Sequence, residues 1–126
     1  MAWSHGKYYW NELNTRDPEN AKRFYAGLLG WTFDAMPMSQ GKTYWVAKVN
    51  GEPVAGFFDI SGPEFEEVPE AWLGYIAVDD VDARVAKAAA DGAQVMKDAF
   101  DVPGVGRIAV LLDPGDAAIA LITPSS

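Results

Sequence analysis

The sequence repeats one pattern at half of its own length. Asp17-Pro18 precedes an apolar-periodic segment that ends at Gly30, and Asp80, 63 residues after Asp17, precedes a second such segment that ends at Gly92. An Asp side chain caps a helix because it accepts a bond from a free backbone N–H, and Gly ends a helix because it adopts a left-handed conformation. The interval is half of the 126 residues. We therefore predict two copies of one structural module.

The first copy contains a helix flanked by strands. Its helix begins at Pro18 and has apolar residues at helical spacing, namely Ala21, Phe24, Tyr25, Leu28 and Leu29. The expected strands are residues 7–15, 31–36, 43–49 and 53–60, of which the last two form a hairpin around Asn50-Gly51. A two-residue turn there places Val49 opposite Glu52, Val46 opposite Ala55 and Tyr44 opposite Phe57, and opposed residues share a face of the sheet.

The second copy has the same order of elements. Strands are expected at 72–78, 93–100, 107–113 and 116–123, with a helix from Val81 and a last hairpin around Pro114-Gly115. This register places Arg107 and Ala120 on one face. Between the copies, the acidic segment 61–70 (SGPEFEEVPE) is expected to be a solvated connection.

These elements predict an α+β fold in a single domain, residues 1–126. Module one covers about 7–60, the acidic linker 61–70, and module two about 71–124. In each βαβββ module, one helix covers one face of four strands, and the opposite face needs a partner. Two such sheets curving towards each other would enclose a cup, which is the expected location of any chemistry.

The motifs of both modules resemble those of the vicinal oxygen chelate superfamily, which includes glyoxalase I, bleomycin-resistance proteins and extradiol dioxygenases. The first module contains D-P-x-x-A-x-x-F-Y-x-x-L-L-G-W, and the second V-D-D-V-D-A, G-A, G-R and D-P-G in order. W-x-E-L-x-T-x-D and V-P-G-V-G-R-x-A are most similar to its bacterial glyoxalase-like branch, whose reaction is undefined. The resemblance implies the glyoxalase/bleomycin resistance/dihydroxybiphenyl dioxygenase-like fold and pairing as a homodimer.

The resemblance also implies four positions for ligands of a divalent metal, usually His, Glu or Gln. In this sequence those positions are Trp10, Phe57, Leu73 and Ala120, whose side chains cannot ligate such a cation. The only histidine is His5, so a site with two histidines and a carboxylate cannot form within one chain. We therefore predict no metal ligand and no cofactor.

Strand alternation predicts which side chains face the cup. The expected ligand-binding residues are Trp10, Glu12, Asn14, Tyr44, Phe57, Leu73, Tyr75, Arg107 and Ala120, with Lys48 on the same face. The aromatic rings could stack on a planar or apolar ligand, or they could fill the cup as core. Arg107 could bind an anionic group of a ligand, or it could pair with Glu12.

Glu12 is the candidate catalytic residue. A carboxylate beside aromatic rings could act as a general base or accept a hydrogen bond from a ligand. The alternative is a structural ion pair with Arg107 or Lys48.

Charge and composition exclude several classes of function. The net charge is −8 and the ten Lys and Arg residues are dispersed, which disfavours binding of nucleic acid. No apolar run reaches the length of about 20 residues that spans a membrane. The chain has no Cys, which is compatible with the cytoplasmic location that we expect.

Three functions are compatible with these features. The first is metal-independent binding of a small organic molecule in the cup, comparable to sequestration by bleomycin-resistance proteins. The second is a lyase or isomerase that uses Glu12 as acid/base, with or without a divalent metal on non-standard ligands. The third is a protein-interaction domain in which the cup is solid core.

Overall fold

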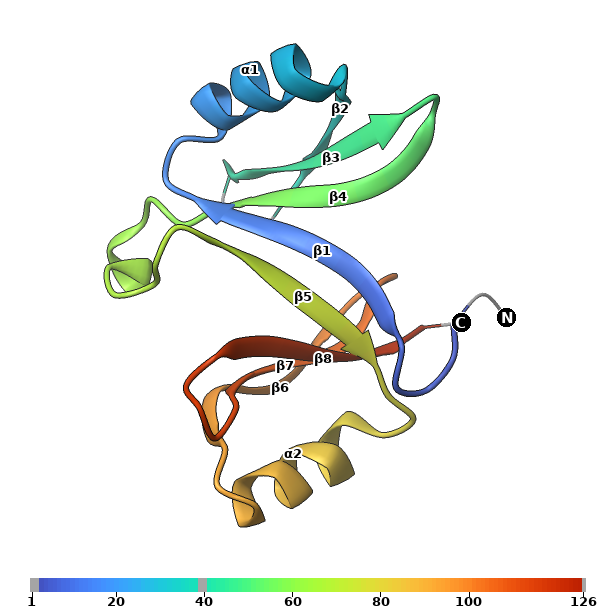
Figure 1. Ribbon diagram of the computed structural model, residues 1–126, viewed down its shortest axis with the longest axis vertical. Coiled ribbons are helices and arrows are strands. Elements are labelled where there is room, and N and C mark those ends of the chain that lie inside the picture. The colour runs from blue at the N-terminus through green and yellow to red at the C-terminus, as the bar shows by residue number, and fades with distance from the viewer. Residues whose placement is uncertain (1–2, 39–40, 126) are drawn as a thin grey trace. The chain divides into compact units, whose positions relative to one another are not determined.

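Figure 1 shows the computed structural model, which describes residues 3–38 and 41–125. The strands are β1 (Tyr8–Thr15), β2 (Thr32–Pro37), β3 (Thr43–Val49), β4 (Glu52–Asp59), β5 (Ala71–Ala77), β6 (Gln94–Val102), β7 (Gly106–Leu112) and β8 (Ala118–Pro124). The helices are α1 (Pro18–Leu29), the short 3-10 helix η2 (Pro63–Phe65) and α2 (Val81–Ala90). Their order confirms an α+β fold of two βαβββ modules.

The chain divides into two compact units. Module one is Trp10–Trp72, and module two is the described part of 73–126 together with residues 3–9. The N-terminal residues belong with module two because the N–H of Gly6 donates to the carbonyl of Ala77, and the N–H of Ala77 donates to the carbonyl of Lys7. The segment 61–70 lies within module one.

In module one the strand order is β2-β3-β4-β1, and α1 lies on one side of these strands (Figure 1). Helix α1 begins as predicted, because Asp17 Oδ1 accepts the N–H of Asn20 at 3.0 Å, and it ends at Gly30 with φ 74°. The side facing α1 is aromatic: Tyr25 contacts Trp31, Phe57 and Trp72 at centroid distances of 5.4, 5.8 and 5.6 Å.

The predicted register of the β3–β4 hairpin is correct only next to the turn. Val49 lies opposite Glu52, as expected, and Asn50 and Gly51 both have positive φ. A β-bulge then shifts the pairing between Ala47 and Lys48, so that Trp45 rather than Tyr44 lies opposite Phe57, and Val46 lies opposite Gly56 rather than Ala55. A bulge adds one residue to one strand, and one residue changes the face of every side chain beyond it.

In module two the strand order is β5-β8-β7-β6. Asp80 caps α2 by accepting the N–H of Ala83 at 3.2 Å. The core between α2 and the strands is aliphatic: Val78, Val81 and Ala109 are buried, and Leu121 packs against them.

The register of the β7–β8 hairpin also differs from the prediction. The connection between the strands runs from Asp113 to Ala117, because Asp113 Oδ1 accepts the N–H groups of Gly115 and Ala117. Val110 therefore lies opposite Ala120, and Ala109 lies opposite Leu121 on the α2 side. The prediction that Arg107 shares a face with Ala120 is wrong, since Arg107 lies on the same face of β7 as Ala109, the α2 side, and Ala120 lies on the other.

Within the described residues, none of the helices has the length and apolar character needed to cross a membrane.

Candidate functional site

One face of the module-one strands carries polar and aromatic side chains. Leu13 lies beside Phe57 in the parallel register of β1 and β4, and Phe57 contacts Tyr25 of α1. Alternation along β1 therefore places Trp10, Glu12 and Asn14 on the opposite side of the sheet. We call this side, which carries Trp10, Glu12, Asn14, Tyr44 and Phe58, the Tyr44 face.

Three of these residues form a hydrogen-bonded chain. Trp10 Nε1 donates to Tyr44 Oη at 2.9 Å, and Tyr44 Oη donates to Glu12 Oε1 at 3.1 Å. Gly56 lies beside Glu12 in the register of β1 and β4, and a Cβ atom at Gly56 would collide with the Tyr44 hydroxyl and ring. The missing side chain at Gly56 is thus what lets Tyr44 lie across the sheet between Trp10 and Glu12.

Burial determines the protonation state of Tyr44. Desolvation, followed by the charge of Glu12 and the hydrogen bond to it, raises the pKa of Tyr44 well above its usual value, although the bond from Trp10 acts in the opposite direction. Glu12 is only 8% exposed. Tyr44 therefore remains a neutral phenol at neutral pH and donates its hydroxyl to Glu12.

Asn14 adds a polar atom to the same face. Its Oδ1 is buried and has no hydrogen-bond partner among the described residues. A buried acceptor of this kind loses the free energy of a hydrogen bond unless a donor reaches it. Asn14 lies beside Phe58 in the β1–β4 register, so this acceptor is on the face that carries Trp10 and Tyr44.

Three predicted site residues come together in module two. Tyr75 lies beside Ala120 in the parallel register of β5 and β8, and alternation places Leu73 on the same side of β5. All three are buried, with 8%, 0% and 6% of their surface exposed for Tyr75, Ala120 and Leu73. This side of the module-two strands is apolar and lies opposite α2.

Phe57 and Arg107 lie on other faces than we predicted. Phe57 is fully buried and contacts Phe33 and Trp72 as well as Tyr25, so it belongs to the core beneath α1. The prediction for Phe57 fails because the bulge in the β3–β4 hairpin shifts the pairing of the two strands by one residue.

The Arg107 guanidinium is bound by Asp82 of α2 at 2.8 and 3.1 Å and by Asp101 of β6 at 3.1 Å. These two carboxylates raise the pKa of Arg107 above its usual value. Arg107 therefore stabilises module two on the side of α2. Lys48, the other cation considered for Glu12, forms an ion pair with Asp34.

The metal site that the superfamily resemblance implies does not fit these residues. Trp10 donates its N–H to Tyr44, Phe57 is in the α1 core, and Leu73 and Ala120 offer no lone pair. Across residues 3–38 and 41–125, no group of three or more His, Cys, Asp or Glu side chains is placed to hold a metal ion.

Sequence reasoning missed Gly56 and Arg16. Gly in the interior of a strand often marks a place where another group approaches the backbone closely, and this signal could have identified the contact with Tyr44. Arg16 lies between Thr15 and Asp17, and nothing in the local pattern shows that it binds the segment 61–70.

Comparison with known proteins relates this fold and these motifs to one family. The family model described as glyoxalase-like domain matches residues 11–122. The chain is 42% identical over 120 residues to the putative glyoxylase CFP32 of Mycobacterium tuberculosis, covering 95% of this chain and 45% of that protein. It is 31% identical over 123 residues to the anthracycline biosynthesis protein DnrV of Streptomyces peucetius, covering 89% of this chain and 45% of that protein. The chain thus spans about half the length of the curated relatives that it matches.

Solved structures show the same fold at low identity. A hypothetical protein from Bacillus halodurans C-125 matches with a TM-score of 0.69 and 15% identity, covering 98% of this chain and 97% of that one. A methylmalonyl-CoA epimerase from Mycobacterium tuberculosis matches with a TM-score of 0.64 and 20% identity, covering 100% and 93%.

Proposed function

Because the chain belongs to the glyoxalase-like domain family of the vicinal oxygen chelate superfamily, we propose that it binds a small organic molecule on the Tyr44 face, without a metal ion. This function is comparable to sequestration by bleomycin-resistance proteins. The ligand class that suits the face is planar and largely apolar, with a hydrogen-bond donor for Asn14.

The observation that carries this proposal is the chain from Trp10 through Tyr44 to Glu12. Each ring is held by a hydrogen bond to its neighbour, so little conformational freedom is lost when a ligand packs against the rings. Fixed aromatic rings offer a planar ligand offset or edge contacts worth about 0.5–1.5 kcal/mol each beyond area burial. DnrV, one of the relatives, is named for anthracycline biosynthesis, which makes a planar polycyclic molecule the first probe to test.

A fluorescence titration with the anthracycline daunorubicin tests the proposal. Tyr44→Phe removes the hydroxyl that joins Trp10 to Glu12, and we expect it to weaken binding about tenfold, the effect of losing one fixed hydrogen bond. Tyr25→Phe is the matched control, because Tyr25 accepts a hydrogen bond from Trp72 Nε1 at 3.1 Å on the α1 side of the same module.

The control should change the Kd less than about twofold, within the effect of an exposed hydrogen bond. An equal loss of binding in both variants would contradict the assignment to the Tyr44 face. Failure of the wild-type protein to bind any member of a panel of planar metabolites and antibiotics would contradict the function.

The burial of Glu12 favours one alternative, a lyase or isomerase in which Glu12 is the acid/base. A buried carboxylate that is held by a phenol hydroxyl is suited to moving a proton at a defined position. Glu12→Gln keeps an acceptor for Tyr44 but cannot exchange a proton. It should abolish turnover if the protein is an enzyme, and at most weaken binding if the protein only sequesters its ligand. Elemental analysis of the purified protein separates the two further, because a stoichiometric divalent metal would favour the enzyme.

A further inference from the structure

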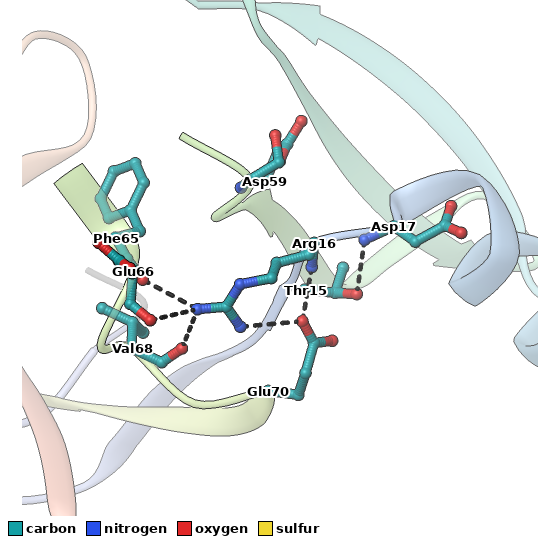
Figure 2. A network of polar contacts seen from close by, with 9 residues as sticks. Thr15, Arg16, Asp17, Asp59, Phe65, Glu66, Val68 and Glu70 are labelled. Carbon is teal, nitrogen blue, oxygen red and sulfur yellow. Dashed lines mark hydrogen bonds and ion pairs between the residues drawn. The ribbon is translucent and has the colours of Figure 1, made fainter. Parts of the chain in front are cut away.

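Arg16 joins the end of β1 to the segment 61–70 (Figure 2). Its Nη2 donates to the backbone carbonyls of Phe65, Glu66 and Val68 at 2.9, 3.2 and 2.6 Å. Its Nη1 lies 3.3 Å from Glu70 Oε2, and its backbone N–H donates to the same oxygen at 2.7 Å. Arg16 therefore contacts the segment both at its central turn and at its end, where β5 is about to begin.

These contacts depend on the shape of the guanidinium group. Two separate nitrogens of one planar group are used at once, because Nη1 reaches the carboxylate while Nη2 reaches the carbonyl oxygens, and the single nitrogen of an ammonium cannot occupy both positions. Partial burial tends to raise the pKa of Glu70, but hydrogen bonds from Thr15 and from Arg16, with the charge of Arg16, hold that pKa below its usual value. Glu70 is thus an anion that Arg16 binds at neutral pH.

The segment that Arg16 holds is folded. Pro63–Phe65 forms η2, and the N–H of Val68 donates to the carbonyl of Phe65 at 2.9 Å. The side chains of Glu64, Glu66 and Glu67 are exposed, as expected of a solvated connection, but the backbone of the segment is folded.

The folded segment places one aromatic ring against a strand of module one, β4. The Phe65 and Phe58 rings lie 5.3 Å apart at 86°, an edge-to-face contact. Phe58 shares the Tyr44 face with Asn14, its partner in the β1–β4 register. Lys42 Nζ lies 5.1 Å from the centroid of Phe65 and donates to the carbonyl of Asp59 at 3.2 Å, which holds the ring from another side. Phe65 therefore stands at the Asn14 end of the Tyr44 face.

We infer that Arg16 is a positioning residue that fixes Phe65 as the end wall of the Tyr44 face, and that this wall limits the length of the planar ligand that the face accepts. The inference rests on the proposed function, because the wall matters only if a ligand binds beside it. It assigns ligand selection to the segment 61–70 and separates that role from the binding contacts of Trp10 and Tyr44.

Hydrogen exchange tests the positioning role without any ligand. Arg16→Lys keeps the charge but cannot serve three carbonyls and Glu70 together. The hydrogen-bonded amides within 63–68, those of Phe65, Glu66 and Val68, should therefore exchange about tenfold faster or more. Arg23→Lys is the matched control, because Arg23 lies on α1 and donates to Asn20 Oδ1 of the same helix at 3.3 Å. Unchanged exchange at 63–68 in Arg16→Lys would overturn the inference.

Ligand length tests the end wall. The probes are 1,4-dihydroxyanthraquinone, with three fused rings, and daunomycinone, with four. Wild-type protein should bind the shorter probe with the lower Kd. Both Phe65→Ala and Arg16→Lys should reduce the ratio of the two Kd values about three- to tenfold, which corresponds to the free energy of one aromatic contact. Arg23→Lys should keep the wild-type preference.

The two experiments separate the possible failures. An unchanged preference in Phe65→Ala and Arg16→Lys, with tight binding of both probes, would overturn the end wall and leave the proposed function intact. Absence of binding to the wild-type protein would overturn both, even if exchange at 63–68 responds to Arg16→Lys.

Discussion

The two modules share one order of elements but differ on both sides of their strands. Opposite α1, module one carries the hydrogen-bonded chain of Trp10, Tyr44 and Glu12. Opposite α2, module two carries the buried Leu73, Tyr75 and Ala120. Leu73 and Tyr75 follow Trp10 and Glu12 by the 63-residue repeat, so the copies have kept the backbone pattern while their side chains differ. The difference teaches that the same order of elements can carry a hydrogen-bonded polar face in one module and a largely apolar face in the other.

The residues that precede the two helix caps differ in the same way. In module one this residue is Arg16, which binds the segment 61–70. In module two it is Asp79, which binds Arg84 of α2 at 3.0 Å, while its own N–H donates to His5 Nδ1 at 3.0 Å. Equivalent positions thus carry opposite charges and attach different segments to the strand ends.

The largest expected effect tests the aromatic core of module one against the aliphatic core of module two. Phe57→Ala should lower the free energy of unfolding by about 4 kcal/mol, because it empties the place of a fully buried ring beneath α1. Val81→Ala, which removes a buried side chain of α2 from the aliphatic core of module two, should cost about 2 kcal/mol. Denaturant unfolding monitored by circular dichroism measures both. A larger loss for Val81→Ala would contradict this difference between the cores.

A smaller effect tests why the Tyr44 face can exist. Gly56→Ala introduces a Cβ that collides with Tyr44, so it should cost about 1–3 kcal/mol and disrupt the chain from Trp10 to Glu12. Gly27→Ala on α1 is the control, since a Cβ there meets no atom within 4 Å, and it should stabilise the helix by up to about 1 kcal/mol. If Gly56→Ala is as stable as wild type and still binds ligand, the close packing of Tyr44 is not required.

Acid titration sharpens the comparison of Arg16 and Asp79. The hydrogen bond from Arg84, its charge and the charge of His5 lower the pKa of Asp79 to about 2, although slight desolvation acts in the opposite direction. The pKa of Glu70 is also lowered. Both carboxylates have lower pKa values in the folded state, so each stabilises the fold above its unfolded pKa and loses that contribution as the pH falls through its folded pKa.

The stability difference between wild type and Asp79→Asn should therefore shrink as the pH falls from about 4 to about 2, the interval between the unfolded and folded pKa values. Glu70→Gln should behave in the same direction in module one. Unfolding midpoints measured at successive pH values test this, and a difference that stays constant down to pH 2 would contradict it.

The last prediction concerns the oligomeric state of the wild-type protein. The superfamily resemblance predicts a homodimer, which light scattering at micromolar concentration measures directly. A monomer under these conditions would contradict the predicted homodimer.

The sequence predicted what is encoded locally. Asp17 with Pro18, and Asp80, identified both helix starts, because capping needs only neighbouring residues. The repeat of these signals predicted the fold, and the motifs predicted the superfamily, which the glyoxalase-like family match confirms.

Sequence reasoning failed where a register shift of one residue decides which side of the sheet a side chain faces. Phe57 and Arg107 were assigned to the wrong sides because a bulge beside Ala47 and a longer connection at Asp113 each shift a hairpin register by one. The contacts of Arg16 with Phe65 and Glu70 join residues about 50 positions apart, which no local pattern encodes.

The most direct test of ligand binding on the Tyr44 face is a nuclear magnetic resonance titration of metal-free protein with daunorubicin, which follows the indole N–H signals. The Trp10 Nε1 proton lies on the Tyr44 face, and that of Trp72 is bonded to Tyr25 on the α1 side. We predict a saturable shift of the Trp10 signal and little change at Trp72. A shift at Trp72 alone, or binding only after a divalent metal is added, would contradict the proposal.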